Sequence, residues 1–167
     1  MMRQRRIVLL GAAMAMIATM AMWTPSAAAV GVGHDPLHGD WQLNIEKSTF
    51  RPGPGPKGQL RSYRLEGDTE KLTARGVSAE KKPSLVQYEA KYDGKDYSIT
   101  GSTGGDKISL RRIDALTTES TQKRDGKAAI TTRRTVSADG KTLTVTAKGT
   151  LPDGQALDSV LIFEKKH

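Results

Sequence analysis

The fold is decided by residues 123–165, which read KRDGKAAITTRRTVSADGKTLTVTAKGTLPDGQALDSVLIFEK. Asp-Gly pairs recur in this stretch every 14 residues, at 125–126, 139–140 and 153–154. Asp-Gly tolerates the positive φ angles of tight hairpin turns. Between the pairs the polarity alternates: Leu143, Val145 and Ala147 share one face, and threonines share the other. This pattern predicts long antiparallel strands joined by two-residue turns.

The same pattern covers most of the chain. Further turn pairs stand at 67–68, 93–94 and 104–106, and no helical periodicity is present after residue 57. Residues 51–57 read RPGPGPK, and prolines alternating with glycines exclude both helix and ladder there. The strand candidates are 41–47, 60–65, 71–77, 85–92, 96–101, 107–112, 116–123, 128–137, 141–150 and 157–165.

Many consecutive strands with hairpin-length connections form a meander. A sheet of this size removes its exposed edges by closing on itself. The predicted fold class is therefore all-β, an antiparallel up-and-down meander closed into a barrel of eight to ten strands. The alternative is a β-sandwich, which needs longer crossing connections than the sequence provides.

The N-terminus has the three parts of an export signal. Three arginines precede an apolar run from Ile7 to Met22, and Ala27-Ala28-Ala29 follows. The run is shorter than the roughly 20 residues that a membrane-spanning helix needs. We therefore predict a signal peptide rather than an uncleaved anchor, and no transmembrane segment after cleavage.

The expected organisation has three parts. Residues 1–29 form the signal peptide, 30–38 a flexible leader and 39–167 a single β-barrel domain. The signal implies a periplasmic or secreted protein. The chain has no cysteine, so no disulfide supports the fold, and its stability must come from a packed β core.

The charge pattern bears on the class of partner. The chain has 26 Lys and Arg against 18 Asp and Glu, a net charge of +8. The basic residues are scattered among the acids, and no basic stripe with stacking aromatics is present. This distribution argues against a nucleic-acid partner.

The region after residue 38 resembles a family of small secreted bacterial proteins described as lipocalin-like, a calycin-type barrel. The resemblance begins with Gly39-Asp40-Trp41, which is similar to the Gly-x-Trp start of lipocalins. It continues through 42–44, 47–50, 52–54, 88–97, 110–114 and 134–145. It implies a closed barrel of the type found in lipocalins and fatty-acid-binding proteins, and it brings no established activity.

The resemblance also implies a structural role for Trp41 and Gly39. In lipocalin-like barrels this tryptophan closes the bottom of the barrel, and an arginine from a late strand lies over its ring. A large apolar plug and a cation–π contact explain the arrangement.

Two arginines are candidate ligand-binding residues. In the predicted strands, alternate residues point to the same side. Arg112 therefore shares a face with Ile108 and Leu110, and Arg134 shares a face with Ile130 and Val136. Inside a barrel, uncompensated guanidinium groups would need an acceptor, which a ligand carboxylate would supply. Intracellular fatty-acid carriers hold their ligand's head group in this way. The alternative is that both arginines lie near strand ends and reach water.

Three tyrosines are further candidates. Tyr88 and Tyr92 share a face with Ala90, and Tyr97 shares a face with Ile99. An apolar ring with a polar tip suits an amphiphilic ligand. The alternative is that these tyrosines belong to the barrel core.

No other chemistry is predicted. His34 and His38 have a spacing that can suit a metal, but they lie in the leader without a rigid framework. No nucleophile and base are paired by the sequence, so we expect no enzyme, cofactor or metal.

The function expected from these observations is an exported binding protein for a small apolar or amphiphilic ligand, such as a fatty acid. The alternative is a filled barrel that acts as an envelope interaction or inhibitor module. The two differ in cavity volume, because a carrier needs about 300 Å³ or more.

The export signal gives the first testable prediction. Protein recovered from the periplasm or medium should begin at Val30, within a residue or two, because Ala27 and Ala29 occupy the −3 and −1 positions. N-terminal sequencing checks this. Recovery of a chain beginning at Met1 from the inner membrane would contradict cleavage.

Overall fold

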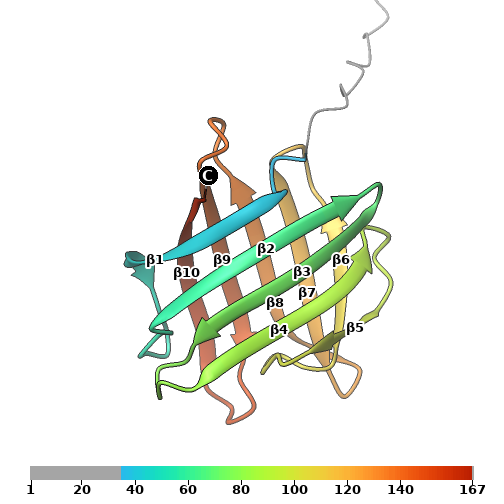
Figure 1. Cartoon of the computed structure of the whole chain (residues 1–167). Helices are drawn as coiled ribbons and strands as arrows, with labels where there is room; N and C mark the ends of the chain where they lie inside the picture. The colour runs from blue at the N-terminus through green and yellow to red at the C-terminus, as the bar shows by residue number, and fades with distance from the viewer. Residues whose placement is uncertain (1–34, 167) are drawn as a thin grey trace, which may run out of the picture. The chain divides into compact units, whose positions relative to one another are not determined.

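The computed structural model describes residues 35–166, which contain ten β-strands (Figure 1). They are β1 (Gly39–Thr49), β2 (Gly58–Glu66), β3 (Thr69–Val77), β4 (Pro83–Lys91), β5 (Tyr97–Thr100), β6 (Lys107–Arg112), β7 (Thr117–Arg124), β8 (Lys127–Val136), β9 (Thr142–Thr150) and β10 (Ala156–Lys165). Each of the ten predicted strands corresponds to one of these.

The strands form one closed antiparallel barrel. Each strand pairs with its neighbour in sequence, and β1 closes the ring by pairing with β10, for example Leu43 with Phe163. The predicted fold class is confirmed, with ten strands. Closure leaves no unpaired sheet edge for another chain to join. The ladder is shortest at β5, which pairs two residues with each neighbour.

The turn prediction is correct in position and partly wrong in length. At Asp125-Gly126 both residues have positive φ, 52° and 73°, and they form the two-residue turn between β7 and β8. At Asp139-Gly140 and Asp153-Gly154 the connections have five residues instead of two. Each is closed by an additional bond, such as that from the Ser137 amide to the Thr142 carbonyl at 2.8 Å.

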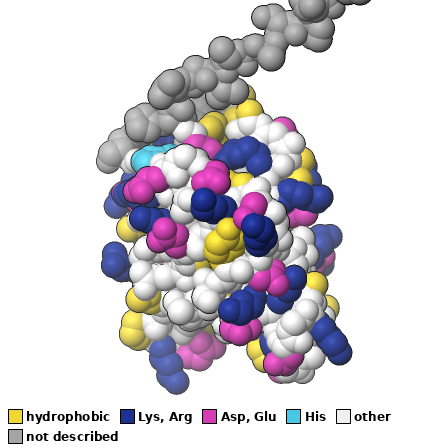
Figure 2. All heavy atoms as spheres, turned by 90° about the vertical axis from the view of Figure 1, so that its right-hand side faces the viewer, with side chains coloured by type: hydrophobic (Ala, Val, Ile, Leu, Met, Phe, Trp, Pro, Cys, Tyr) yellow, Lys and Arg dark blue, Asp and Glu magenta, His cyan; other side chains and the backbone are white. Residues whose placement is uncertain are grey.

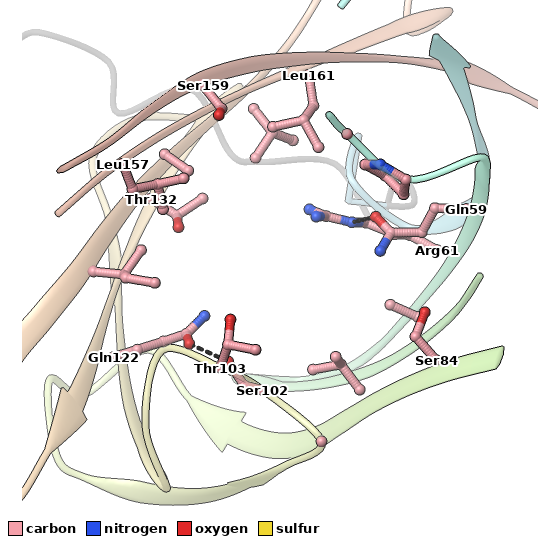
Figure 3. Close-up of a pocket in the computed structure, with 18 of the residues that line it drawn as sticks. Gln59, Arg61, Ser84, Ser102, Thr103, Gln122, Thr132, Leu157, Ser159 and Leu161 are labelled. Atoms are coloured by element: carbon pink, nitrogen blue, oxygen red, sulfur yellow. Dashed lines mark hydrogen bonds between the residues drawn. The ribbon is translucent and has the colours of Figure 1, made fainter. Parts of the chain in front are cut away.

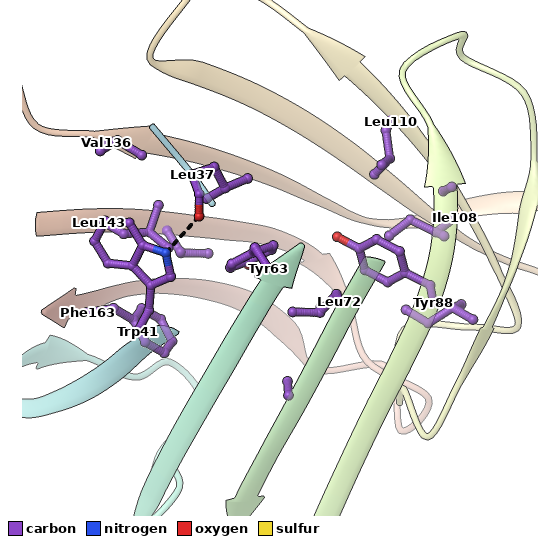
Figure 4. Close-up of a cluster of buried hydrophobic side chains, with 14 of the residues drawn as sticks. Leu37, Trp41, Tyr63, Leu72, Tyr88, Ile108, Leu110, Val136, Leu143 and Phe163 are labelled. Carbon is purple, nitrogen blue, oxygen red and sulfur yellow. Dashed lines mark hydrogen bonds between the residues drawn. The ribbon is translucent and has the colours of Figure 1, made fainter. Parts of the chain in front are cut away.

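One end of the barrel is filled by large side chains, and we call it the plug end (Figure 4). Trp41 is fully buried there among Leu37, Leu143 and Phe163. Its indole Nε1 donates a 2.8 Å hydrogen bond to the Leu37 carbonyl, which satisfies the one polar group of the plug.

The cation over Trp41 is a lysine, not the expected arginine. The Lys165 Nζ lies 5.0 Å from the centroid of the Trp41 ring. Gly39 lies next to the Lys165 side chain. Its φ is +131°, and a Cβ at this position would lie 2.9 Å from the Lys165 Cε. The absence of a side chain at Gly39 therefore leaves room for the lysine stem.

The predicted flexible leader extends too far. Residues 35–38 are part of the packed structure, because Leu37 is 2 % exposed and the His38 amide donates to the Asp35 carbonyl at 2.8 Å. An apolar side chain under the plug tryptophan fixes this segment. The signal peptide (1–29) and leader residues 30–34 lie outside the described residues.

The outer surface carries mixed charge. Figure 2 shows lysines and arginines interspersed with acids over the face in view. Several form exposed ion pairs, including Lys47 with Glu164 at 2.9 Å and Arg111 with Glu119 at 2.8 Å. Within residues 35–166 no helix has the length and hydropathy to cross a membrane.

The turn at Gly140 allows a test with a matched control. Gly140 has a φ of +69°, whereas the φ of Gly58 lies outside the left-handed region, and a Cβ at either would meet no atom within 4 Å. We expect Gly140→Val to lower the free energy of unfolding by more than about 1 kcal/mol, because a β-branched residue resists positive φ. Gly58→Val should not lower it. Urea unfolding measures both, and equal effects would show that φ does not govern this turn.

Candidate functional site: a cavity opposite the plug

The end of the barrel opposite the plug is hollow. A cavity of about 570 Å³ lies inside the strands, and residues 50, 52, 54–56, 78–80 and 101–103 at the loop end border it. In Figure 3 the labelled side chains surround an open space. The described barrel is therefore not filled along its whole length.

Small inward-facing residues leave this space. In the hollow half Ala74, Ser120 and Ser159 are buried and line the cavity. In the plug half the buried side chains include the large rings of Trp41 and Phe163. The alternation of strand residues sets which side chains face inward, and their size decides where the interior is empty.

The lining combines two kinds of side chain. Apolar residues include Phe50, Leu72, Val86, Ile99 and Ile108. Polar residues include Gln59, Arg61, Ser84, Ser102, Thr103, Gln122, Thr132 and Ser159, labelled in Figure 3. A cavity with both kinds of wall can hold a molecule with apolar and polar parts.

Arg61 is a half-buried cation of the cavity wall. Its Nε donates to the Gln59 Oε1 at 2.9 Å, and its Nη1 donates to the Tyr63 hydroxyl at 3.4 Å. Its guanidinium lies over the Phe163 ring, 4.6 Å from the centroid. Among residues 35–166 no carboxylate pairs with Arg61. These contacts orient the guanidinium without neutralising its charge.

Arg134 also lines the cavity, and its charge is compensated. The side chain is 3 % exposed, and its Nη1 donates to the Glu70 Oε1 at 2.6 Å and to the Tyr88 hydroxyl at 2.9 Å. The Tyr88 and Tyr92 hydroxyls each donate to one oxygen of the Glu70 carboxylate. Glu70 is thereby bound by three donors in the barrel interior.

Burial and charge set the protonation states of Tyr88 and Arg134. Burial raises the pKa of Tyr88 well above its usual range, so its hydroxyl stays protonated and donates. Burial has the largest single effect on the pKa of Arg134 and lowers it, but Glu70 together with the surrounding tyrosines outweighs burial and raises that pKa well above the usual range. Arg134 therefore remains a cation.

Arg134 keeps two donors without a partner. Its Nε and Nη2 are buried, and neither forms a hydrogen bond within the described part of the chain. Thr118, the register partner of Arg134 on β7, also has a buried hydroxyl without a hydrogen-bond partner among the described residues. Buried donors without acceptors are costly, so Arg134 has unused hydrogen-bonding capacity beside the cavity.

The structure separates the five predicted ligand-binding residues. Arg134 and Tyr88 line the cavity; Arg112, Tyr92 and Tyr97 do not. Tyr92 packs against the hydrophobic core and donates to the Glu70 carboxylate, and the Tyr97 hydroxyl donates to the Asp93 carboxylate at 3.0 Å.

The premise that Arg112 and Arg134 lack an acceptor within the chain is wrong. Arg112 pairs with Asp35 and lies over the Tyr92 ring at 4.5 Å, and Arg134 pairs with Glu70. Local periodicity assigned these residues to a face but did not show which distant carboxylate meets them.

Sequence reasoning missed Arg61 and Glu70. A signal for both was present, because Arg61 alternates with Gln59 and Tyr63, and Glu70 alternates with Leu72. A charged residue in an otherwise inward-facing series indicates an interior partner or site. Among the described residues no group of three or more His, Asp or Glu is placed to hold a metal; His34 lies outside them.

Comparisons with known proteins support the fold. No protein-family model matches the sequence, and no curated protein does. The crystal structure of zebrafish ileal bile acid-binding protein complexed with cholic acid is similar, with a TM-score of 0.52 and 12 % sequence identity. The match covers 78 % of this chain and 99 % of that chain. The chain therefore has a calycin-type β-barrel fold.

The buried ion pair gives a stability prediction. Arg134→Met should lower the free energy of unfolding by about 3 to 5 kcal/mol, because it leaves the Glu70 carboxylate buried without its cation. The double change Arg134→Met with Glu70→Gln should recover a large part of this loss. Urea unfolding of the single and double variants measures both effects.

Arg112→Met is the matched control. Its side chain is 33 % exposed, so we expect a loss of about 1 kcal/mol or less. If Arg134→Met were as mild as this control, the interior ion pair would not be structurally important.

Proposed function

We propose that the protein is an exported carrier that binds a small amphiphilic molecule with one acid group, such as a fatty acid. The observation that carries the proposal is the 570 Å³ cavity with Arg61 in its wall, a cation that has no carboxylate partner among residues 35–166. An interaction module with a filled barrel would need no such space.

The size of the cavity supports a small-molecule ligand. Ligand pockets in proteins usually measure about 300–1,000 Å³. The apolar lining of Phe50, Val86 and Ile99 provides a surface for the ligand's hydrocarbon part. Each buried methylene of such a chain contributes about 0.8 kcal/mol to binding.

The charge of Arg61 supports an acid as the polar group. A carboxylate at Arg61 would form charge-assisted hydrogen bonds, each worth about 1.5–3 kcal/mol. The guanidinium is already fixed by Gln59 and by the Phe163 ring, so little side-chain freedom is lost on binding.

The similar fold adds an independent argument. The zebrafish protein is described in complex with cholic acid, a small amphiphilic acid. A protein of similar fold thus binds such a molecule, which is compatible with the proposal for this chain.

Export is part of the proposal and rests on the sequence. The basic, apolar and small-residue segments of residues 1–29 favour a signal peptide. A chain without cysteine needs no thiol protection in an oxidising compartment. We therefore propose a periplasmic or secreted location.

Binding of a fluorescent fatty acid tests the function. Wild-type protein should bind the probe at micromolar or lower concentration, and Arg61→Met should weaken binding about tenfold or more, because one charge-assisted bond is lost. Fluorescence titration gives the dissociation constants. Absence of binding by the wild type would contradict the carrier function and favour the interaction module.

Arg112→Met provides the control for charge. It removes an arginine that does not line the cavity, so the dissociation constant should stay unchanged. Equal weakening by the two substitutions would show that the net charge of the barrel, and not the position of Arg61, governs binding.

A further inference from the structure

The two arginines of the cavity differ in what they can bind. Arg61 has no carboxylate partner among the described residues, whereas Arg134 donates to Glu70 at 2.6 Å. Apart from Glu80 in the loop of residues 78–80, the cavity wall therefore holds one uncompensated cation and one ion pair with no net charge. This difference bears on the chemistry of the carrier's ligand, and the inference rests on the proposed function.

Arg134 can take an oxygen but not a second carboxylate. Its Nε and Nη2 have no acceptor within residues 35–166, and the residue is only 3 % exposed. A ligand carboxylate there would come close to the fully buried Glu70 carboxylate, and like charges repel strongly in such a place. A hydroxyl or carbonyl oxygen accepts the same hydrogen bonds without this repulsion.

Both arginines contact the same tyrosine. Arg61 reaches the Tyr63 hydroxyl at 3.4 Å, and the Arg134 guanidinium lies 5.4 Å from the centroid of the Tyr63 ring. One ligand can therefore reach both guanidinium groups, with its acid at Arg61 and a neutral oxygen at Arg134.

The neighbouring wall is also suited to oxygenated ligands. Ser120 on β7 and Thr132 on β8 are register partners, and both line the cavity. Thr132 is the next residue before Arg134 on the inward face of β8. Their hydroxyls can donate to or accept from a ligand hydroxyl. A plain hydrocarbon chain would leave these groups without a partner.

We propose that the ligand is an oxygenated acid: it carries one acid group, bound by Arg61, and a hydroxyl or carbonyl oxygen, bound by Nε and Nη2 of Arg134. The Arg134–Glu70 pair selects for this oxygen and excludes a second acid group.

Calorimetric titration with a panel of acids tests the proposal. Tetradecanoate is compared with its regioisomers that carry one hydroxyl at different carbons, using the mature protein. At least one isomer should bind about tenfold more tightly than tetradecanoate, because it gains a hydrogen bond to a charged donor. If no isomer binds more tightly than the parent acid, this inference is wrong while the proposed function stands. If neither the parent acid nor any isomer binds, both fail.

Variants locate the preference. Arg134→Lys retains a cation beside Glu70 but lacks the forked donors, and the double change Arg134→Met with Glu70→Gln removes donors and buried charge together. In both variants the affinity ratio between the best hydroxy isomer and tetradecanoate should fall from about tenfold to about one, whereas Arg112→Met should retain that ratio. Thermal unfolding identifies a variant that is not folded, and the other then decides. Survival of the preference in a folded Arg134 variant would overturn the assignment.

Discussion

A buried ion pair connects opposite sides of the barrel. Glu70 on β3 and Arg134 on β8 belong to strands that lie across the closed ring from each other, and their side chains meet at its centre. On one side of this pair the interior is filled by Trp41 and its neighbours; on the other it is hollow. The position of the pair therefore sets the boundary between packed core and cavity.

Such a pair is stable only when its hydrogen-bonding groups are satisfied. Removing a carboxylate and a guanidinium from water costs several kcal/mol for each, and good geometry must offset that cost. Glu70 meets the condition, because two tyrosine hydroxyls and Arg134 surround it. In Arg134 only one of the three guanidinium nitrogens, Nη1, has hydrogen-bond acceptors among the described residues. This asymmetry leaves two unsatisfied donors on Arg134, and the proposed recognition of a ligand oxygen starts from them.

The sequence predicted the barrel well because its signals are local. Turn pairs such as Asp125-Gly126 and period-two strands depend on neighbouring residues, so they can be read directly. The contact of Glu70 with Arg134 joins residues 64 apart, and periodicity carries no information about such partners. For a similar reason the sequence does not decide whether the barrel is hollow or filled. The cavity volume depends on how small residues such as Ala74 and Ser159 combine around the ring, and no single strand reveals that sum.

The closure of β1 on β10 has a consequence for attachment. β1 begins and β10 ends at the plug, and the Lys166 amide donates to the Asp40 carbonyl at 2.8 Å, so the two chain ends of the barrel leave from the same pole. The cavity faces the other pole. A dye, tether or fusion partner joined at either chain end would be attached at the plug pole. The cavity, at the opposite pole, would then point away from the attachment point. The cavity of immobilised protein would thus remain accessible from solution without any redesign of the surface.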